Sequence, residues 1–192
     1  MRFLRASERI GTPWKNGGGT TTEVAVFPSG AAFDDFGWRI SIAEVRQGGA
    51  FSIFPGVDRK LAVLEGRMSL AIPGRKNIEL SPASAPAEFP GDAMCEATLV
   101  GGPVTDLNVM TRRGAFASKM TRRAFEGAYT AQHRSATTVV IALAEMTATH
   151  AGGSYKLNAR DGLLMEEEPV GRMVFCAAAG VAILFWIDIS MA

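Results

Sequence analysis

Residues that could hold a small molecule gather near the amino end of this 192-residue chain. Residues 14–23 read WKNGGGTTTE, so an aromatic ring, an amide and three glycines precede a β-prone run with a carboxylate. Glycines let a backbone approach a ligand or a neighbouring strand closely, at a cost in conformational entropy. We therefore expect a ligand-facing loop, with a plain β-bulge as the alternative. Its candidate binding residues are Trp14, Asn16, Gly17, Gly18 and Gly19.

Arginines on two predicted strands are suited to bind a carboxylate, because a guanidinium can grip it with two parallel hydrogen bonds. Arg39 shares a strand face with Ser41 and other small side chains, which indicates a polar cavity rather than a packed core. Glu23, on the preceding strand, could pair with Arg39 or face the same cavity. For the pair Asp58–Arg59, a turn-stabilising role is the alternative. The further candidates for ligand binding are Glu23, Arg39, Phe54, Asp58, Arg59 and Asn108.

Metal and nucleophile chemistry find little support in the residue pattern, and no catalytic residue can be assigned. The only two histidines, His133 and His150, are far apart, and we expect both at the surface and no metal or other cofactor. The chain has no GxSxG nucleophile elbow, and its glycine triplet lacks the Gly-Lys-Ser/Thr of a phosphate loop. Cys95 and Cys176 are expected to be buried apolar residues rather than a disulfide.

The composition of the chain argues against nucleic acid and membrane as binding partners. Lysine and arginine number 20 against 19 aspartates and glutamates, and a net charge of +1 argues against a dedicated nucleic-acid binder. Residues 173–187, MVFCAAAGVAILFWI, are shorter than the roughly 20 residues of a spanning helix, so a pair of buried strands is expected and no membrane contact. The amino end lacks the apolar segment of a signal peptide, which favours a cytoplasmic location.

Short β-prone segments separated by glycine and proline turns dominate the chain and predict an all-β fold. Residues 111–135 differ, because they are basic and lack a long apolar run, and we expect a connector that is in part helical. The second half then repeats the pattern of the first: residues 60–72, for example, resemble residues 138–151. This repeat predicts two similar β-barrels or sandwiches.

Five motifs, in this order and spacing, resemble the HutD (Ves) family of the cupin superfamily: WKNGGGTTTE, FGWRISIAEV, FSIFPGVDRKLAVLEG, FPGD and DLNVMTRRG. The match is dense up to residue 114 and rests on length and pattern beyond it; Leu107 stands where an aromatic is expected. The resemblance implies a bicupin, with two cupin-like β-barrels or jelly rolls in one chain and no histidine-rich metal motif. We expect residues 1–112 to form a ligand-binding barrel, and residues 113–192 the connector and a second barrel.

The resemblance also implies a link to bacterial histidine utilisation and binding of a small pathway-related acid such as formylglutamate. We expect a metal-independent protein that binds a small anionic metabolite and moderates this pathway. Arg39 or Arg59 would hold the carboxylate, Asn16 and the glycine amides the polar end, and Trp14 and Phe54 would wall the pocket.

Two other functions stay open. One is a metal-independent isomerase, epimerase or lyase that acts on a small acid or sugar derivative, with Glu23 or Asp58 transferring the proton. The other is a protein-interaction module whose pocket is vestigial. The small anion is the expected partner, nucleic acid and membrane are not, and a homodimer is left open.

Overall fold

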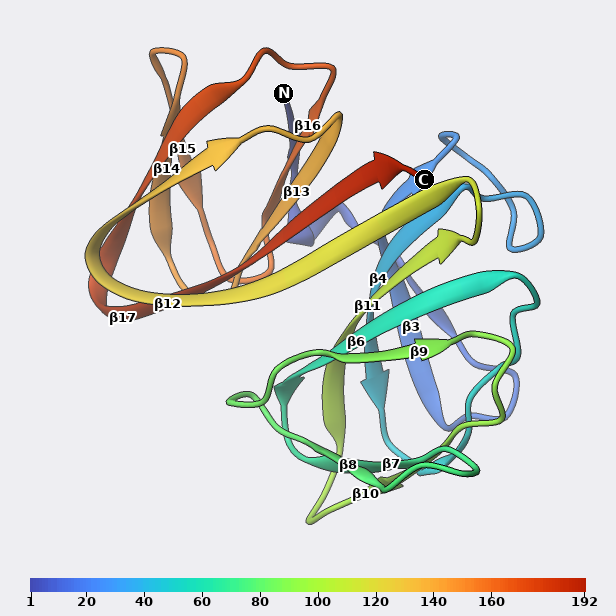
Figure 1. Ribbon diagram of the computed structural model, residues 1–192. Helices are drawn as coiled ribbons and strands as arrows, with labels where there is room; N and C mark the ends of the chain where they lie inside the picture. The colour runs from blue at the N-terminus through green and yellow to red at the C-terminus, as the bar shows by residue number, and fades with distance from the viewer. The chain divides into compact units, whose positions relative to one another are not determined.

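The computed structural model describes all residues from Met1 to Ala192 and is built almost entirely of β-strands (Figure 1). The predicted all-β class is confirmed, since the one helical element is the short 3₁₀ turn η1 (Ala6–Glu8). None of the structure's helical segments has the length and hydrophobicity needed to cross a membrane. The strands are β1 (Arg2–Leu4), β2 (Gly11–Pro13), β3 (Gly19–Phe27), β4 (Trp38–Val45), β5 (Gly49–Ala50), β6 (Val57–Glu65), β7 (Met68–Ala71), β8 (Ile78–Leu80), β9 (Ala87–Pro90), β10 (Glu96–Leu99), β11 (Val104–Arg112), β12 (Phe116–His133), β13 (Thr137–Ala142), β14 (Met146–His150), β15 (Gly153–Leu157), β16 (Gly162–Glu166) and β17 (Gly171–Met191).

The chain divides into two units. The first unit comprises Arg9–Ala117 and the last residue, and the second comprises Met1–Glu8 together with Ser118–Met191. The first unit holds a six-stranded sheet in the order β2-β3-β4-β11-β6-β9 and a four-stranded sheet in the order β5-β10-β7-β8. The second unit holds a seven-stranded sheet in the order β1-β16-β13-β17-β14-β15, with β12 paired to β17.

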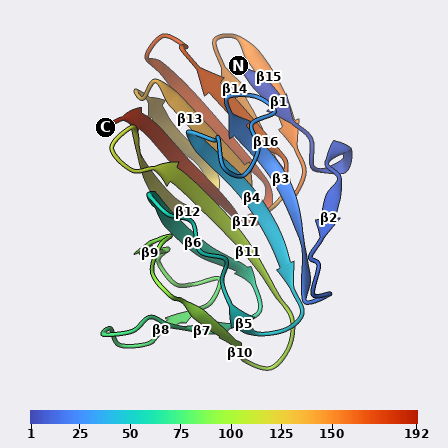
Figure 2. The same ribbon diagram turned by 90° about the vertical axis from the view of Figure 1, so that its right-hand side faces the viewer.

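Strand register defines the inner face of the first unit's larger sheet, in which β3, β4 and β11 run side by side (Figure 2). Asn108 of β11 lies directly opposite Ser41 of β4 and Leu61 of β6. Because opposed residues of an antiparallel pair point to the same face, these three side chains share one face. Leu61 belongs to an apolar core that also includes Met68 and Leu70 of the smaller sheet, so this face is inside the unit. We call the space between the two sheets the first interior.

In the second unit, one long strand stands where we predicted two buried strands. The carboxyl-terminal strand β17 runs over 21 residues from Gly171 to Met191. It pairs with β14 through Met173–Ala177 and with β13 through Leu184–Ile189. Gly180, between these two stretches, adopts a φ of 52°, which is rare for other residues. The strand therefore continues from one part of the curled sheet to the next without the break that we expected.

The basic segment that we expected to be a partly helical connector is strand β12 instead. Phe125, Tyr129 and Ala131 all occupy odd positions and pack on the core of the second unit. Side chains alternate between the two faces of a strand, so the residues between them are free to be polar. The arginines and lysine of this segment hide that period of two in the sequence, and this is why the helical prediction was wrong.

Candidate functional site

Arg59 of β6 is a buried cation in the first interior. Only 4% of its surface is exposed, and its guanidinium carbon lies 4.8 Å, 5.7 Å and 5.3 Å from the ring centres of Phe51, Phe54 and Phe89. Its Nη1 donates a hydrogen bond of 3.4 Å to the Ser52 carbonyl, while its Nε has no partner. Burial lowers the pKa of Arg59 to about 10, against the opposing effect of the Asp106 charge, so the side chain is still a cation at neutral pH.

Two further polar residues of β11 face the same interior without bonding to Arg59. Asp106 is 2% exposed, and burial raises the pKa of its carboxyl to about 7, although the charge of Arg59 opposes this rise. Asn108 is 8% exposed, and its Oδ1 accepts no hydrogen bond. Buried polar atoms are normally paired, so unpaired atoms of Arg59 and Asn108 on one inner face indicate room for a guest molecule or water.

Of the two arrangements expected for Glu23, the structure shows the pair with Arg39, at the outer part of the same face. The Nε of Arg39 donates to the Glu23 carboxylate at 2.9 Å, and Arg39 is 7% exposed while the Glu23 side chain is 43% exposed. The ring of Phe33 covers the Arg39 guanidinium at 4.2 Å and stacks on Phe54 with ring centres 6.0 Å apart. Since Phe54 also lies over Arg59, the two arginines belong to one continuous cluster.

The WKNGGG turn makes hydrogen bonds of its own. The Trp14 indole donates to Thr21 Oγ1 at 2.7 Å, and Asn16 Oδ1 accepts from the Gly18 backbone at 3.0 Å. Asn16 is exposed, whereas Trp14 is half-buried. Alternation places Thr21 on the same face of β3 as Glu23, so Trp14 lies on the inner face, as a pocket wall requires.

Close strand packing explains Gly19, and backbone conformation explains Gly17. A Cβ on Gly19 would lie 2.5 Å from the Glu44 carbonyl and 3.0 Å from the ring of Trp14, which is too close for any other residue. Gly17 has a φ of 73°, a value that favours glycine. The Gly18 carbonyl accepts backbone hydrogen bonds from Arg46 at 2.8 Å and from Gln47 at 3.2 Å. Ligand contact by these glycines therefore stays a prediction.

Asp58 lies on the other face of β6 from Arg59, and we leave it out of the site. Its carboxylate accepts a hydrogen bond from Arg113 Nε at 2.9 Å rather than pairing with its neighbour. Arg113 also binds the Asp92 carboxylate, and this hydrogen bond lowers the pKa of Asp92. The three side chains fasten the start of β6 to the end of β11.

The site also contains residues that were not predicted for it: Phe33, Phe51, Phe89 and Asp106. A signal for Asp106 existed, because Asp106 and Asn108 alternate with apolar neighbours along residues 104–112. The aromatic residues come from three separate segments, and only the fold brings them around Arg59.

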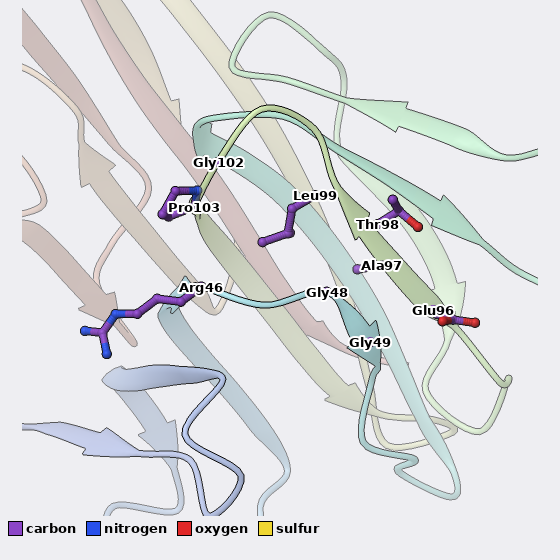
Figure 3. Close-up of a pocket in the computed structure, with 9 residues that line it drawn as sticks. All are labelled: Arg46, Gly48, Gly49, Glu96, Ala97, Thr98, Leu99, Gly102 and Pro103. Atoms are coloured by element: carbon purple, nitrogen blue, oxygen red, sulfur yellow. The ribbon is translucent and has the colours of Figure 1, made fainter.

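A surface hollow of about 440 Å³ lies elsewhere on the first unit, along the edge of β5 and β10 (Figure 3). Arg46 and Glu96 project at its two ends, and glycines form much of its wall. Arg46 already lies 3.8 Å from Glu44 in an ion pair. No side-chain atom of this hollow is both buried and unpartnered, so we place the candidate site in the first interior.

Both histidines are buried in the second unit, contrary to our expectation. His133 is 1% exposed, and its Nδ1 lies 2.8 Å from Thr138 Oγ1. Thr138 donates onward to Asp188 at 3.0 Å, and Trp186 donates to the same carboxylate oxygen at 2.9 Å. His150 is 8% exposed, with Nδ1 3.2 Å from the Arg172 carbonyl. Each histidine falls on the inward-facing phase of its strand, which the residue pattern around it does not reveal.

The model of the HutD family matches residues 6–184, which is most of the chain. The chain belongs to the HutD family. A relative from Pseudomonas putida, described as an uncharacterized 21.2 kDa protein in the hutC 3′ region, is 40% identical over 57% of this chain. The match spans 57% of that relative's length as well, so just over half of the curated protein is covered.

Solved structures of other proteins resemble this chain over almost its full length. A conserved protein of unknown function from Pseudomonas aeruginosa has a TM-score of 0.87 and 30% identity, and the match covers 98% of both chains. HutD from Pseudomonas fluorescens has a TM-score of 0.84 and 26% identity over 100% of this chain and 98% of that chain. A cupin barrel protein from Leptotrichia buccalis, with a TM-score of 0.61, 11% identity and coverage of 96% of this chain and 97% of that chain, supports the cupin fold alone.

Proposed function

We propose that this HutD-family protein binds a small anionic metabolite in the first interior. The observation that carries the proposal is Arg59, a buried cation whose Nε has no hydrogen-bond partner. A buried charge is costly unless it is paired, and no direct ion pair joins Arg59 to a carboxylate. A carboxylate guest would supply that partner in the geometry that a guanidinium prefers.

The unpaired atoms and the aromatic rings of the site also indicate which other chemical groups the ligand carries. Asn108 Oδ1 is an acceptor, so it calls for a donor on the ligand. The aromatic rings around Arg59 favour a compact guest with an apolar stem. A formylglutamate-like acid has these parts, because its formamide N–H lies close to a carboxylate. Urocanate offers an imidazole N–H and a carboxylate in a flatter shape.

The biological role that we propose is moderation of histidine utilisation. It is supported by membership of the HutD family and by the location of the related Pseudomonas putida protein in the hutC 3′ region. We also propose that the two units are two cupin-like barrels and that only the first has the ligand pocket. The division of the chain into two all-β units supports this reading.

A calorimetric titration with formylglutamate and with urocanate tests the binding function. We expect heat of binding with at least one of them for the natural chain, and none for Arg59→Met at the same concentrations. Arg75→Met is the matched control, because Arg75 is an exposed arginine of the same unit, in the turn after Ile72. If folded natural protein gives no heat with either acid, both named ligands are ruled out.

A second candidate, a metal-independent enzyme, is favoured by one observation. The Asp106 carboxyl is buried and has a pKa of about 7, which suits a general acid or base at neutral pH. Incubating the protein with each acid and following the solution by NMR would detect conversion. Turnover that survives a chelator and disappears in Asp106→Asn would favour the enzyme, and binding without conversion would exclude it for these two acids.

A further inference from the structure

We propose that Asp106 takes up a proton from solvent when an anion binds in the first interior, and that the resulting carboxylic acid donates a hydrogen bond to that anion. This inference rests on the proposed binding function. It adds a residue that senses the charge of the guest, and it makes the affinity for an anion depend on pH.

Strand register places Asp106 within reach of a guest held by Arg59. The inward-facing residues of β11 are Asp106, Asn108 and Met110, and they lie opposite Val63, Leu61 and Arg59 of β6. Asp106 and the Arg59 backbone are thus four residues apart along the strand direction, which is about 13 Å. The long arginine side chain spans part of this distance, and the unpaired Asn108 lies midway. A small acid that contacts Arg59 and Asn108 therefore approaches the Asp106 carboxyl.

Above about pH 7, where Asp106 is ionised, the charges that face this space balance before any guest arrives. Arg39 of β4 is neutralised by Glu23 of β3 through their 2.9 Å ion pair. Arg59 of β6 and Asp106 of β11 then form one positive and one negative group that interact through space. Cys95, which precedes β10, is also near Arg59, but burial raises the pKa of its thiol, so it stays neutral at physiological pH.

Each carboxylate of a guest would add one uncompensated negative charge to this balanced interior, so urocanate would leave one in excess and formylglutamate two. Burying an uncompensated carboxylate is costly, and a second negative charge nearby disfavours ionisation of the first. Protonation of Asp106 removes one of these negative charges and also provides an O–H donor. The step costs little near neutral pH, because burial has already raised the pKa of Asp106 to about 7. Acceptance of the O–H by a carboxylate oxygen would give a short, charge-assisted hydrogen bond.

Proton uptake predicts how affinity changes with pH. Below about pH 7 the acid form is present without the guest, and affinity is flat. Above that pH each binding event must capture a proton, so affinity falls by up to about tenfold for each pH unit. Between about pH 6 and pH 8.5 the natural chain should lose at least about tenfold in affinity for formylglutamate.

The decisive measurement is a calorimetric titration with formylglutamate at these two pH values, repeated at the higher pH in triethanolamine and in Tris, two buffers that are not anions. These buffers differ in ionisation heat, so the difference between the two titrations counts protons, and we expect about one taken up per ligand bound. Asp106→Asn keeps an N–H donor but cannot titrate. It should bind with the same affinity at both pH values, and more tightly than the natural chain at the higher one. Glu126→Gln, an exposed change in β12, should keep the natural pH profile.

Each outcome separates the two proposals. Binding with the same affinity at both pH values, or without proton uptake, overturns the role of Asp106 and leaves the binding function intact. A pH dependence that persists in Asp106→Asn also overturns it. Absence of heat at either pH overturns the binding function and this inference together. Should Asp106→Asn fail to fold, the proton count on the natural chain decides alone.

Discussion

The two units differ in what their buried polar side chains bond to. In the second unit, His133, Thr138, Asp188 and Trp186 form a chain of hydrogen bonds, and two buried side-chain atoms, His133 Nε2 and Arg122 Nε, have no partner. In the first unit, buried charged and amide groups share an inner face without bonding to one another. A hydrogen-bonded network adds to stability and specificity, whereas unpaired groups on a common face indicate room for a guest molecule or water.

Substitution of Arg59 should give the largest loss of ligand affinity among the variants that compare the two units. Arg59→Met keeps an unbranched stem against the rings of Phe51 and Phe89 but removes the cation. We expect formylglutamate affinity to fall by at least about 100-fold, because the guest carboxylate would be buried without a partner. Arg39→Met should cost less, since Glu23 already neutralises that arginine. Calorimetry on both variants measures the difference, and equal losses would contradict the special position of Arg59.

The pH dependence of stability should also separate the two units. Because the pKa of Asp106 is raised to about 7 in the folded chain, the folded state holds a proton that the unfolded state releases above about pH 4. The stabilisation is complete below that pH and is lost as pH rises to about 7, by a few kcal/mol over this window. Urea unfolding at several pH values should show this loss in the natural chain.

Asp106→Asn is the matching variant for that measurement. It cannot titrate, so the fall in unfolding free energy between about pH 4 and pH 7 should disappear. Thr138→Val, in the second unit, should keep the fall. A variant of Asp106 that keeps the natural pH profile would mean that another group is responsible.

The sequence predicted those parts of the site that come from consecutive strands, and it missed those that come from strands far apart in the chain. Strand alternation placed Arg39 beside Ser41 on a polar inner face, and it suggested the pair with Glu23. Both inferences used only the alternation of side chains in two strands that follow each other in the chain. The charge interaction of Arg59 with Asp106 depends on the pairing of β6 with β11, which no local pattern specifies.

The errors in the second unit have a related cause. Basic residues within β12 masked its alternation, so a strand was taken for a connector and His133 for a surface residue. The long β17 was divided because glycine and alanine at 177–180 resemble a turn. Local composition gave the correct fold class, whereas the continuity of these strands depends on partners that are distant in sequence.

A pair of near-isosteric substitutions compares the two interiors directly. Thr138→Val should destabilise the second unit by about 1 to 3 kcal/mol, because it leaves His133 Nδ1 unpaired in a dry core. Asn108→Leu should change stability by less than about 1 kcal/mol, because its Oδ1 has no hydrogen bond to lose, yet it should weaken binding of formylglutamate. Urea unfolding gives both values, and equal destabilisation would mean that Asn108 is also part of a structural network.

The smallest effect is expected at the rim of the first interior. Glu23→Gln removes one charge of an ion pair whose carboxylate is partly exposed, so stability should fall by less than about 1 kcal/mol. The effect on binding should be easier to detect. Without the Glu23 charge, Arg39 is uncompensated and can balance part of the charge of an anionic guest. Asp106 then has less negative charge to offset by taking up a proton, so formylglutamate affinity should vary less between about pH 6 and pH 8.5 than in the natural chain. Calorimetry at both pH values measures this change of affinity with pH. An unchanged pH dependence would show that the charge of Glu23 does not affect the protonation of Asp106.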